Sequence, residues 1–480
     1  MRVLFNRLHV SGGENVVLSE SNGIEKPGVI KMNIKENASV FNVLLNLMRF
    51  KKDCHVYAIA ICSDHTHGVF KDSEIKNLTW LCYGDKAYEL FCAGIDETPV
   101  ILSQTLKKLS IPIDVVISVS PLIGRLSQMA ISWKKNVASV VRYETGFDGK
   151  TAHRVDWMRI KKPGYEGMIA ASMIDSANVF LGKSQMRSLL SEYGKILSAH
   201  EMRKIVDRSF VVRNPIDLDE LDKIRNETPF TRTVGSFYRL TDLKGTKDVI
   251  ELYQKMYSSK LIDDAMITTA QAIDLKKELP NLPSKFTAKG SCDRSEYLRI
   301  AQNSKVAVYN SKLESDPTVP IELGYLGVVP VLVNRPWATD SFKDWPLFYD
   351  NMNEAASLVA AVLESEESYR KYADMIKKMI IERSSANEAA DHFWSVVEKE
   401  LCIVDKFYGV EQSVIDDLIA GKIMSVVSSM DRIEWHRVLK INTPVFAGEP
   451  MMHHGDMYRL LLRAGWKDNY EECVPVLTKG

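Results

Sequence analysis

The chain has 480 residues, of which 45% are hydrophobic and 26% charged, an ordinary globular composition whose length predicts two or three domains. Its 62 basic and 62 acidic residues cancel, which excludes a protein that binds nucleic acid through its overall charge. No apolar run approaches the roughly 18 residues that span a bilayer, and Met1–Leu8 lacks a signal-peptide layout. Seven cysteines, an odd number without a Cys-x-x-Cys pair, indicate reduced thiols and a soluble, cytoplasmic location.

The first part of the chain alternates short apolar runs with helical patterns, which is typical of a parallel α/β sheet. The predicted strands are Arg2–Leu8, Val56–Cys62, Val100–Ser103, Asp114–Ser118, Val137–Tyr143, Met168–Ser172, Val179–Leu181 and Phe210–Arg213. The predicted helices are Ser39–Arg49, Asp85–Ala93, Ser120–Lys134 and Ser184–Tyr193.

A charged segment, Asp217–Thr228, predicts a linker to a second α/β unit. The strands expected there are Thr233–Leu240, Ser284–Ala288, Lys305–Tyr309 and Val328–Val333. The expected helices are Thr246–Tyr257, Ser295–Asn303, Glu354–Glu364 and Glu367–Arg383, whereas Asp263–Leu275 has no decisive pattern. The last residues, Cys402–Gly480, are predicted to form a mainly helical accessory extension, with helices near Ser413–Ser429 and Met457–Ala464.

Two short segments of the second unit carry the strongest chemical signal. Arg239-Leu-Thr-Asp-Leu-Lys244-Gly245 places two cations where a predicted strand ends and a helix begins. Glu314-Ser-Asp-Pro-Thr-Val-Pro-Ile-Glu322 places two carboxylates beside the next such junction. Ligands of open α/β sheets bind at these junctions, where cations suit a diphosphate and carboxylates suit sugar or ribose hydroxyls. The pattern predicts a sugar-nucleotide site, although each charge read alone is also compatible with an exposed helix start.

The arrangement resembles the C-terminal half of retaining glycosyltransferases of the GT-B fold, in particular the large family four. Five segments follow one another in the order expected for that family: Asn214–Leu221, Arg239–Gly245, Ser295–Asn310, Glu314–Glu322 and Glu322–Val331. The resemblance covers about Ser172 to Glu400 and is weak before that. It implies an α/β protein with two Rossmann-like domains facing a cleft: an acceptor domain 1–215, a nucleotide-sugar domain 216–385, a helix 386–401 that crosses back to the first domain, and the extension 402–480.

The resemblance also implies roles for the motif residues. Arg239 and Lys244 would stabilise the departing nucleoside diphosphate, and Glu314 would contact the transferred sugar. Glu322 would accept the ribose hydroxyls of a nucleoside-diphosphate sugar, with a UDP-sugar favoured and no obligatory metal. The remaining donor contacts would come from backbone groups of Asp316, Thr318, Val319, Gly12 and Gly13, although the two glycines also fit an ordinary turn.

The acceptor side is predicted from the segment Ile101–Lys162, which carries eleven basic and four acidic residues, a net charge of +7. Aromatic residues interleave these charges, a mixture suited to phosphate contact and base stacking. Glu144 stands where the family often has histidine, and an inverting enzyme would need a general base there, from Glu144, Asp148 or His153. The acceptor residues expected from this segment are Glu144, Arg142, Lys134, Lys135 and His153. Asp64-His-Thr-His67 gives only a weak indication of a metal site.

Three functions fit these residues. Glu322-Leu-Gly-x-x-Gly-x-x-Pro-Val resembles phage DNA α-glucosyltransferases that act on hydroxymethylated bases, which favours double-stranded DNA as the partner and, for a phage protein, the host cytoplasm. The alternative acceptor is a lipid-linked sugar or a polysaccharide, which Lys134, Lys135 and Arg159–Lys162 would meet through anionic groups. A non-catalytic nucleotide-sugar-binding protein is the third possibility. The oligomeric state is not predicted.

Overall fold

The structure is a computed structural model, in which two compact units, Met1–Glu400 and Leu401–Gly480, are each described by themselves. It describes residues 1–10, 16–20, 25–31, 48, 53–62, 66–83, 113–118, 137–143, 165–195, 197–226, 228–269, 275–290, 292, 294–383, 387–402, 432–434, 466–471 and 474–479. The predicted strand Val100–Ser103 and helices Asp85–Ala93 and Ser120–Lys134 lie outside these residues, as does Ser39–Arg49 apart from Met48.

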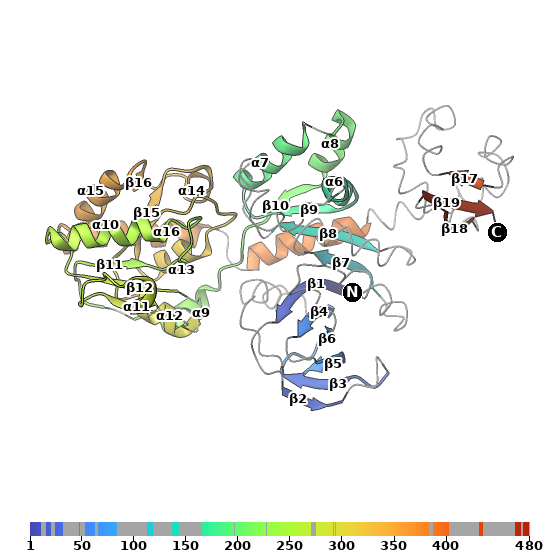
Figure 1. The fold of residues 1–480 in the computed structure, drawn as a ribbon, viewed down its shortest axis with the longest axis horizontal. Helices are drawn as coiled ribbons and strands as arrows, with labels where there is room; N and C mark the ends of the chain where they lie inside the picture. Colours follow the sequence, from blue (N-terminus) through green and yellow to red (C-terminus); the bar gives the residue numbers. More distant parts are fainter. Residues whose placement is uncertain are drawn as a thin grey trace. The chain divides into compact units, whose positions relative to one another are not determined.

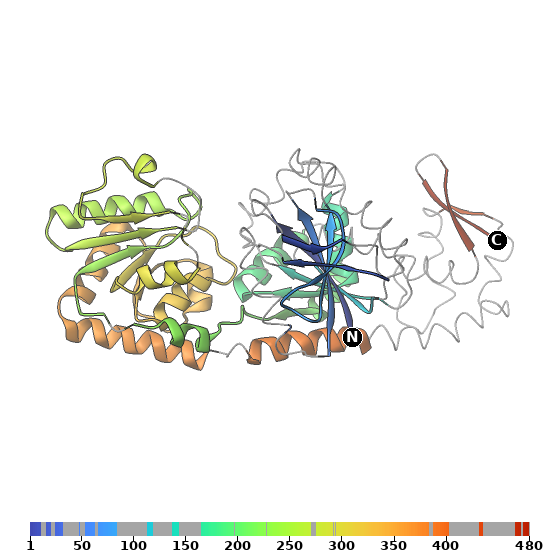
Figure 2. The same cartoon turned by 90° about the horizontal axis from the view of Figure 1, so that it is seen from below.

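The first unit contains a ten-stranded sheet in the order β10-β9-β8-β7-β1-β4-β6-β5-β3-β2 (Figure 1). All neighbouring pairs are parallel except β2–β3 and β5–β6. The view in Figure 2 shows how strongly the sheet twists, as right-handed strand twist requires. The strands are β1 (Arg2–Val10), β2 (Val16–Ser19), β3 (Gly28–Lys31), β4 (His55–Cys62), β5 (Gly68–Asp72), β6 (Leu78–Tyr83), β7 (Val115–Ser118), β8 (Ala138–Tyr143), β9 (Ala177–Phe180) and β10 (Ser209–Val211).

Three helices accompany the end of this sheet: α6 (Tyr165–Asp175), α7 (Lys183–Tyr193) and α8 (Ala199–Asp207). The prediction of a strand at Met168–Ser172 was wrong, because these residues lie inside α6. A short apolar run has no period that separates a buried helix from a buried strand. In the structure Ile169, Met173 and Ile174 are buried in one cluster with Tyr143 and Phe180, so α6 is apolar on its sheet-facing side.

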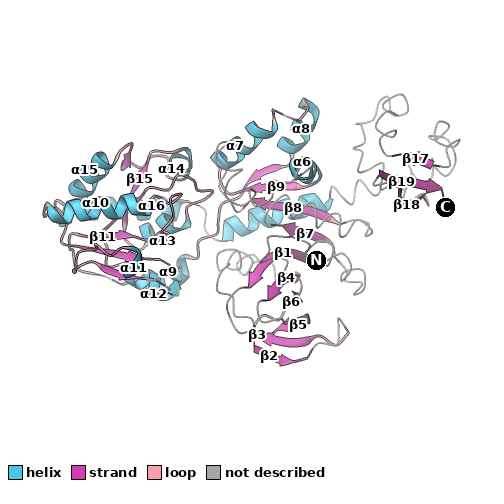
Figure 3. Cartoon of the chain, viewed as in Figure 1, coloured by secondary structure: helices cyan, strands magenta, loops and turns pink. Residues whose placement is uncertain are grey.

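The second sheet has six parallel strands in the order β13-β12-β11-β14-β15-β16, with helices on both faces (Figure 3). Its strands are β11 (Thr233–Ser236), β12 (Asp264–Thr268), β13 (Thr287–Lys289), β14 (Val306–Tyr309), β15 (Val329–Val333) and β16 (Phe348–Tyr349). Its helices are α10 (Thr246–Ser258), α11 (Leu275–Glu278), α12 (Arg294–Ala301), α13 (Thr318–Tyr325), α14 (Pro336–Ser341), α15 (Met352–Leu363) and α16 (Glu366–Glu382).

Both sheets contain a point at which the chain crosses from one side of a central strand to the other. In the second sheet the chain runs from β11 outward through β12 and β13, then returns to β14 on the other side of β11. In the first sheet β1 lies between β4 and β7 in the same way. Ligands of open parallel sheets bind outside the carboxyl ends of strands at such a switch point. The loops after β1, β11 and β14 are therefore the places where the fold predicts a site.

The segment between the sheets is more ordered than predicted. Asp217–Thr228, expected as a linker, contains α9 (Leu218–Ile224), which Asp217 caps by accepting a hydrogen bond from the Glu220 amide. Beyond α16, residues 387–402 are helical, as the sequence predicted for Ala386–Leu401. The carboxylate of Glu400 is buried and pairs with Arg208 at the start of β10. This contact anchors the helix 387–402 to the first sheet.

In the second unit, the described residues form a three-stranded antiparallel sheet of β17 (Arg432–Glu434), β18 (Trp466–Glu471) and β19 (Val474–Lys479). The sequence did not predict these strands. The helices expected near Ser413–Ser429 and Met457–Ala464 lie outside the residues that the structure describes. Among the described helices, none combines the length and the apolar character that would let it cross a membrane.

Helix α13 approaches α16 closely because of one glycine. A Cβ atom at Gly324 would lie 2.9 Å from Ile376 Cγ1 and 2.9 Å from Ile380 Cδ1, both on α16. Both isoleucines are buried, and interiors packed at this density leave no room for the extra carbon. The first residues of α13 belong to the Glu314–Glu322 segment, so the α13–α16 contact also sets where that segment lies.

We predict that Gly324→Ala lowers the free energy of unfolding by about 1–3 kcal/mol, because the added methyl group overpacks the α13–α16 contact. Gly194→Ala is the matched control. Gly194 is exposed and has right-handed helical backbone angles, so its substitution should be neutral or slightly stabilising. Urea unfolding measures both variants, and an equal effect of the two substitutions would contradict the close-packing argument.

Candidate functional site

The two motif loops of the second unit meet at the switch point. Lys244 lies in the loop after β11, and Glu314 in the loop after the neighbouring strand β14. The ammonium group of Lys244 donates a hydrogen bond to Glu314 Oε1, and both side chains are only partly exposed. A cation and a carboxylate 70 residues apart in sequence are thus in direct contact where a parallel sheet places its ligand.

Backbone contacts fix the conformation of the loop Arg239–Gly245. Gly245 has φ +57°, and a Cβ atom there would lie 2.7 Å from the carbonyl oxygen of Asn310, so the position suits only glycine. Thr246 Oγ1 donates a hydrogen bond of 2.7 Å to the carbonyl oxygen of Arg239. This bond closes the loop and leaves the Arg239 side chain exposed at its start. Both cations of the loop, Arg239 and Lys244, therefore precede the first turn of α10, which begins at Thr246.

The predicted strand Thr233–Leu240 ends at Ser236, four residues early. The ring of Phe237 folds back over Gly235, where a Cβ atom would lie 2.1 Å from the ring. The next residue, Tyr238, lies under Lys244, whose ammonium nitrogen is 4.7 Å from the centre of the tyrosine ring. Burial, followed by the charge of Glu314, raises the pKa of Tyr238, which keeps its hydroxyl group neutral.

Glu322 lies in α13 and is buried, but it is paired rather than vacant. Arg294, the first residue of α12, donates from Nη1 to Glu322 Oε2 at 3.1 Å and from Nη2 to Oε1 at 2.7 Å. The same guanidinium donates twice to Glu220 of α9, at 3.3 Å in both cases. Burial lowers the pKa of Arg294, but Glu322 and Glu220 outweigh this effect and raise it, so the guanidinium stays charged.

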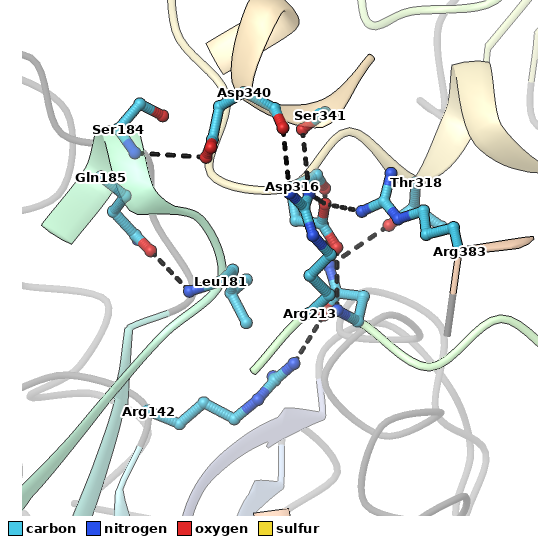
Figure 4. Close-up of polar contacts among 11 residues, drawn as sticks. Arg142, Leu181, Ser184, Gln185, Arg213, Asp316, Thr318, Asp340, Ser341 and Arg383 are labelled. Carbon is cyan, nitrogen blue, oxygen red and sulfur yellow. Dashed lines mark hydrogen bonds and ion pairs between the residues drawn. The ribbon is translucent and has the colours of Figure 1, made fainter. Parts of the chain in front are cut away.

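A second buried carboxylate, Asp316, lies between Glu314 and Glu322 in sequence, and Figure 4 shows it with its partners and neighbouring polar contacts. Its side chain is fully buried and accepts hydrogen bonds from Arg213 Nη1 at 3.4 Å, from the Asn214 backbone amide at 2.8 Å and from Arg383. Arg213 and Asn214 follow β10 of the first sheet, and Arg383 ends α16. We call these four residues the Asp316 cluster. It ties the Glu314–Glu322 segment to the first sheet.

Asn214 extends the Asp316 cluster in two directions. Its side-chain amide nitrogen lies 3.4 Å from Thr318 Oγ1, and its Oδ1 accepts a hydrogen bond of 2.5 Å from Arg142 Nη2 on β8. Arg142 is buried, and burial lowers its pKa to about 10 while the charge of Asp316 opposes this. The prediction that Arg142 lies on an exposed acceptor surface was therefore wrong: a residue inside a parallel strand reads as basic in sequence but points into the protein.

The first sheet approaches the same segment through a glycine. A Cβ atom at Gly182, just before α7, would lie 2.8 Å from the carbonyl oxygen of Ser315. The backbone amide of Ser184 donates to Asp340 Oδ2 of α14 at 3.2 Å. Arg213 Nη2 also donates to the Asp340 carbonyl oxygen at 2.9 Å. The Glu314–Glu322 segment is thus enclosed by groups from β10, α7, α14 and α16.

The remaining predicted residues divide into two groups. Thr318 and Val319 form the first turn of α13, which no side chain caps, so their backbone amides begin the helix beside Glu314. The other group lies outside the described residues and comprises Gly12, Gly13, Lys134, Lys135, Glu144, Asp148 and His153, together with Asp64 and His65 of the weak metal motif. Within the described part of the chain, no cluster of three or more His, Cys, Asp or Glu side chains is arranged to hold a metal.

Sequence reasoning missed Arg294, Arg213 and Arg383. Arg213 and Arg383 approach Asp316 across 103 and 67 residues, and Arg294 approaches Glu322 across 28. Their positions in the sequence were the available signal: Arg294 directly precedes the predicted helix Ser295–Asn303, and Arg213 ends a predicted strand. Both are places where an α/β fold brings side chains to its ligand edge.

The comparisons with known proteins identify the fold. Similar structures include a trehalose-6-phosphate protein from E. coli bound with UDP-2-fluoro glucose, with a TM-score of 0.58, 12% identity and coverage of 82% of this chain and 98% of that one. An α,α-trehalose-phosphate synthase (UDP-forming) from Burkholderia xenovorans, in complex with glucose-6-phosphate, matches with a TM-score of 0.60 and 11% identity over 83% of this chain and 99% of that one. The N-terminal domain of trehalose-6-phosphate phosphatase from Candida albicans matches with a TM-score of 0.57 and 11% identity over 83% and 96%.

These likenesses, together with the two α/β sheets, show that the chain has the GT-B fold predicted from its motifs. No protein-family profile and no curated protein sequence matches the chain. At 11–12% identity the likeness defines the fold, and the activity has to be argued from the site residues.

We predict that Asp316→Asn lowers the free energy of unfolding by about 3–5 kcal/mol, because Arg213 and Arg383 then lack their buried counter-charge. Asp263→Asn is the matched control. Asp263 pairs with Arg232 at 2.6 Å, but both side chains are about half exposed, so this change should cost less than about 1 kcal/mol. Urea unfolding measures the free energy of unfolding of both variants. Similar decreases in the two would refute the prediction that the Asp316 cluster depends on its buried counter-charge.

Proposed function

We propose that this chain is a retaining glycosyltransferase that moves a sugar from a nucleoside-diphosphate sugar, with UDP favoured, to an acceptor hydroxyl group. The observation that carries the proposal is the contact between Lys244 and Glu314 at the carboxyl ends of β11 and β14. It brings a diphosphate-binding cation and a sugar-binding carboxylate together at the switch point of a GT-B sheet. The named ligands of similar structures, UDP-2-fluoro glucose and glucose-6-phosphate, are consistent with this proposal.

The proposed roles follow from charge. As the bond between the sugar and the diphosphate breaks, negative charge grows on the leaving phosphate, and Arg239 and Lys244 stabilise it. Arg239 is exposed at the loop entrance, where its planar guanidinium can meet two phosphate oxygens. Glu314 accepts hydroxyl hydrogens of the transferred sugar, Glu322 accepts those of the ribose, and the first backbone amides of α13 face the phosphates. The acceptor oxygen forms the new bond to the sugar, and its proton passes to the departing diphosphate, which has gained the electron pair of the broken bond.

Donor binding would exchange one ion pair for another. In the ligand-free structure Lys244 is paired with Glu314, so the lysine is neutralised by a carboxylate. A diphosphate offers more charge and more acceptor oxygens, so Lys244 moves its hydrogen bonds to the phosphate and frees Glu314 for the sugar. The pair therefore holds both side chains in place and partly buried until the donor arrives.

For the acceptor, we propose the domain 1–215, with residues 216–385 holding the donor. The acceptor proposed from sequence is a hydroxymethylated pyrimidine in double-stranded DNA, supported by the net charge of +7 in residues 101–162. The burial of Arg142 removes that residue from the set, which leaves Lys134 and Lys135 to contact phosphates. A lipid-linked sugar or a polysaccharide is the alternative acceptor, and the DNA-modification experiment described below separates it from DNA.

We predict that Lys244→Ala reduces release of UDP from UDP-sugars about 10²–10³-fold, because one preorganised cation is lost from the leaving group. Lys247→Ala is the matched control, since Lys247 is exposed in the first turn of α10 and one charge is removed in both variants. The measurement is UDP release under saturating pooled UDP-sugars. If Lys247→Ala lowers turnover as much as Lys244→Ala, the specific role of Lys244 is wrong.

We also predict that a hexose or pentose mass is added to one nucleoside when the protein is mixed with pooled sugar nucleotides and duplex DNA containing hydroxymethylcytosine or hydroxymethyluracil. Mass spectrometry after digestion to nucleosides detects the product. Lys135→Ala should weaken DNA binding and flatten its salt dependence. UDP release without any added mass on DNA would exclude the DNA acceptor and direct the search to lipid and glycan acceptors.

A further inference from the structure

We propose that Arg294 is a positioning residue for nucleotide binding: it fixes the carboxylate of Glu322 in the orientation that accepts the ribose hydroxyls. This inference rests on the proposed function, in which Glu322 binds the ribose. It adds a residue to the site that the motifs did not include. The residue acts through Glu322 and itself touches neither the ribose nor the reacting atoms.

The geometry of the pair carries the inference. The two terminal nitrogens of Arg294 each donate to a different oxygen of Glu322, at 3.1 and 2.7 Å. A planar guanidinium bonded to both oxygens fixes the plane of the carboxylate as well as its position. Each carboxylate oxygen has two lone pairs, and Arg294 uses one on each. The lone pairs that remain have fixed directions, which a hydroxyl donor can match.

Arg294 is itself held from its other side. Glu220 of α9 accepts from Arg294 Nε and Nη2, so the guanidinium bridges two carboxylates. Glu220 belongs to the segment between the two sheets, whereas Arg294 starts α12 and Glu322 lies in α13. Three helices thus converge on one planar cation. A lysine in this place would supply the charge as a single point and could not hold both oxygens of Glu322 in one plane.

The Arg294–Glu322 pair and the Lys244–Glu314 pair would respond differently to a bound nucleotide, because one meets a neutral ribose hydroxyl and the other a charged diphosphate. A ribose hydroxyl is neutral and donates a hydrogen, whereas Arg294 has only donors. The ribose therefore does not compete with Arg294 for Glu322: it binds to the lone pairs that Arg294 leaves. A diphosphate, in contrast, competes with Glu314 for Lys244. Arg294 is built to stay bonded through the binding step, which is the property required of a positioning group.

The test compares UDP with 2′,3′-dideoxy-UDP, which lacks both ribose hydroxyls, by isothermal titration calorimetry. The wild-type protein should prefer UDP at least tenfold. The preference should fall below threefold in Glu322→Ala and also in Arg294→Ala, in which Glu322 is present but no longer oriented. Arg299→Ala is the matched control, because Arg299 is exposed on the same helix and should leave the preference unchanged.

A purely structural role for Arg294 gives a different result, namely weaker binding of both ligands with the wild-type ratio intact, and this would overturn the inference. Arg294→Lys keeps the charge and is the second variant for the case that Arg294→Ala does not fold. Its preference for UDP over 2′,3′-dideoxy-UDP should also fall below threefold, and an unchanged ratio would again overturn the inference. Failure of the wild-type protein to bind UDP would instead refute the proposed function.

Discussion

The contact on which the site depends is the burial of one carboxylate, Asp316, among cations from distant parts of the chain. Two guanidinium groups and a backbone amide satisfy it, and Arg383 retains a buried nitrogen without a hydrogen-bond partner among the described residues. The positive charge exceeds the negative, and burial accordingly lowers the pKa of Arg383 despite the nearby carboxylate. Such an arrangement adds little stability, because burying the charges costs desolvation free energy. It favours one conformation strongly, because only the packing that brings these charges together offsets that cost.

Glu314 and Glu322 are eight residues apart in sequence, and Asp316 lies between them, so its buried contacts help to fix the segment that carries both. The two carboxylates are prepared differently. Glu314 is paired with a flexible lysine that a diphosphate can draw away, whereas Glu322 is held by a rigid fork that a neutral hydroxyl leaves in place. In the proposed function, the first pair exchanges its partner when the diphosphate binds, and the second pair stays intact when the ribose binds.

The sequence predicted the fold class and the motif loops, because Arg239–Gly245 and Glu314–Glu322 lie at strand ends where hydrophobic period and turn residues are informative. It failed where the outcome depends on tertiary contact. Met168–Ser172 lies inside α6, whose Ile169, Ala170, Met173 and Ile174 pack into the core beside the sheet, and a short buried run of this kind fits either a helix or a strand. The hairpin of β5 and β6 was not predicted, although Asp72 caps its turn and accepts from Trp80 Nε1 at 2.7 Å. Arg142 was misplaced because sequence does not show which charges are buried.

The anchor of helix 387–402 has a practical consequence. Glu400 makes its buried pair with Arg208, and the boundary between the two compact units falls immediately after it. A shortened chain that ends at Cys402 therefore retains every contact described here for the two large sheets, including both ion pairs of the motif loops. The contribution of the last segment can therefore be measured by subtraction, in a chain that keeps every residue of both ion pairs.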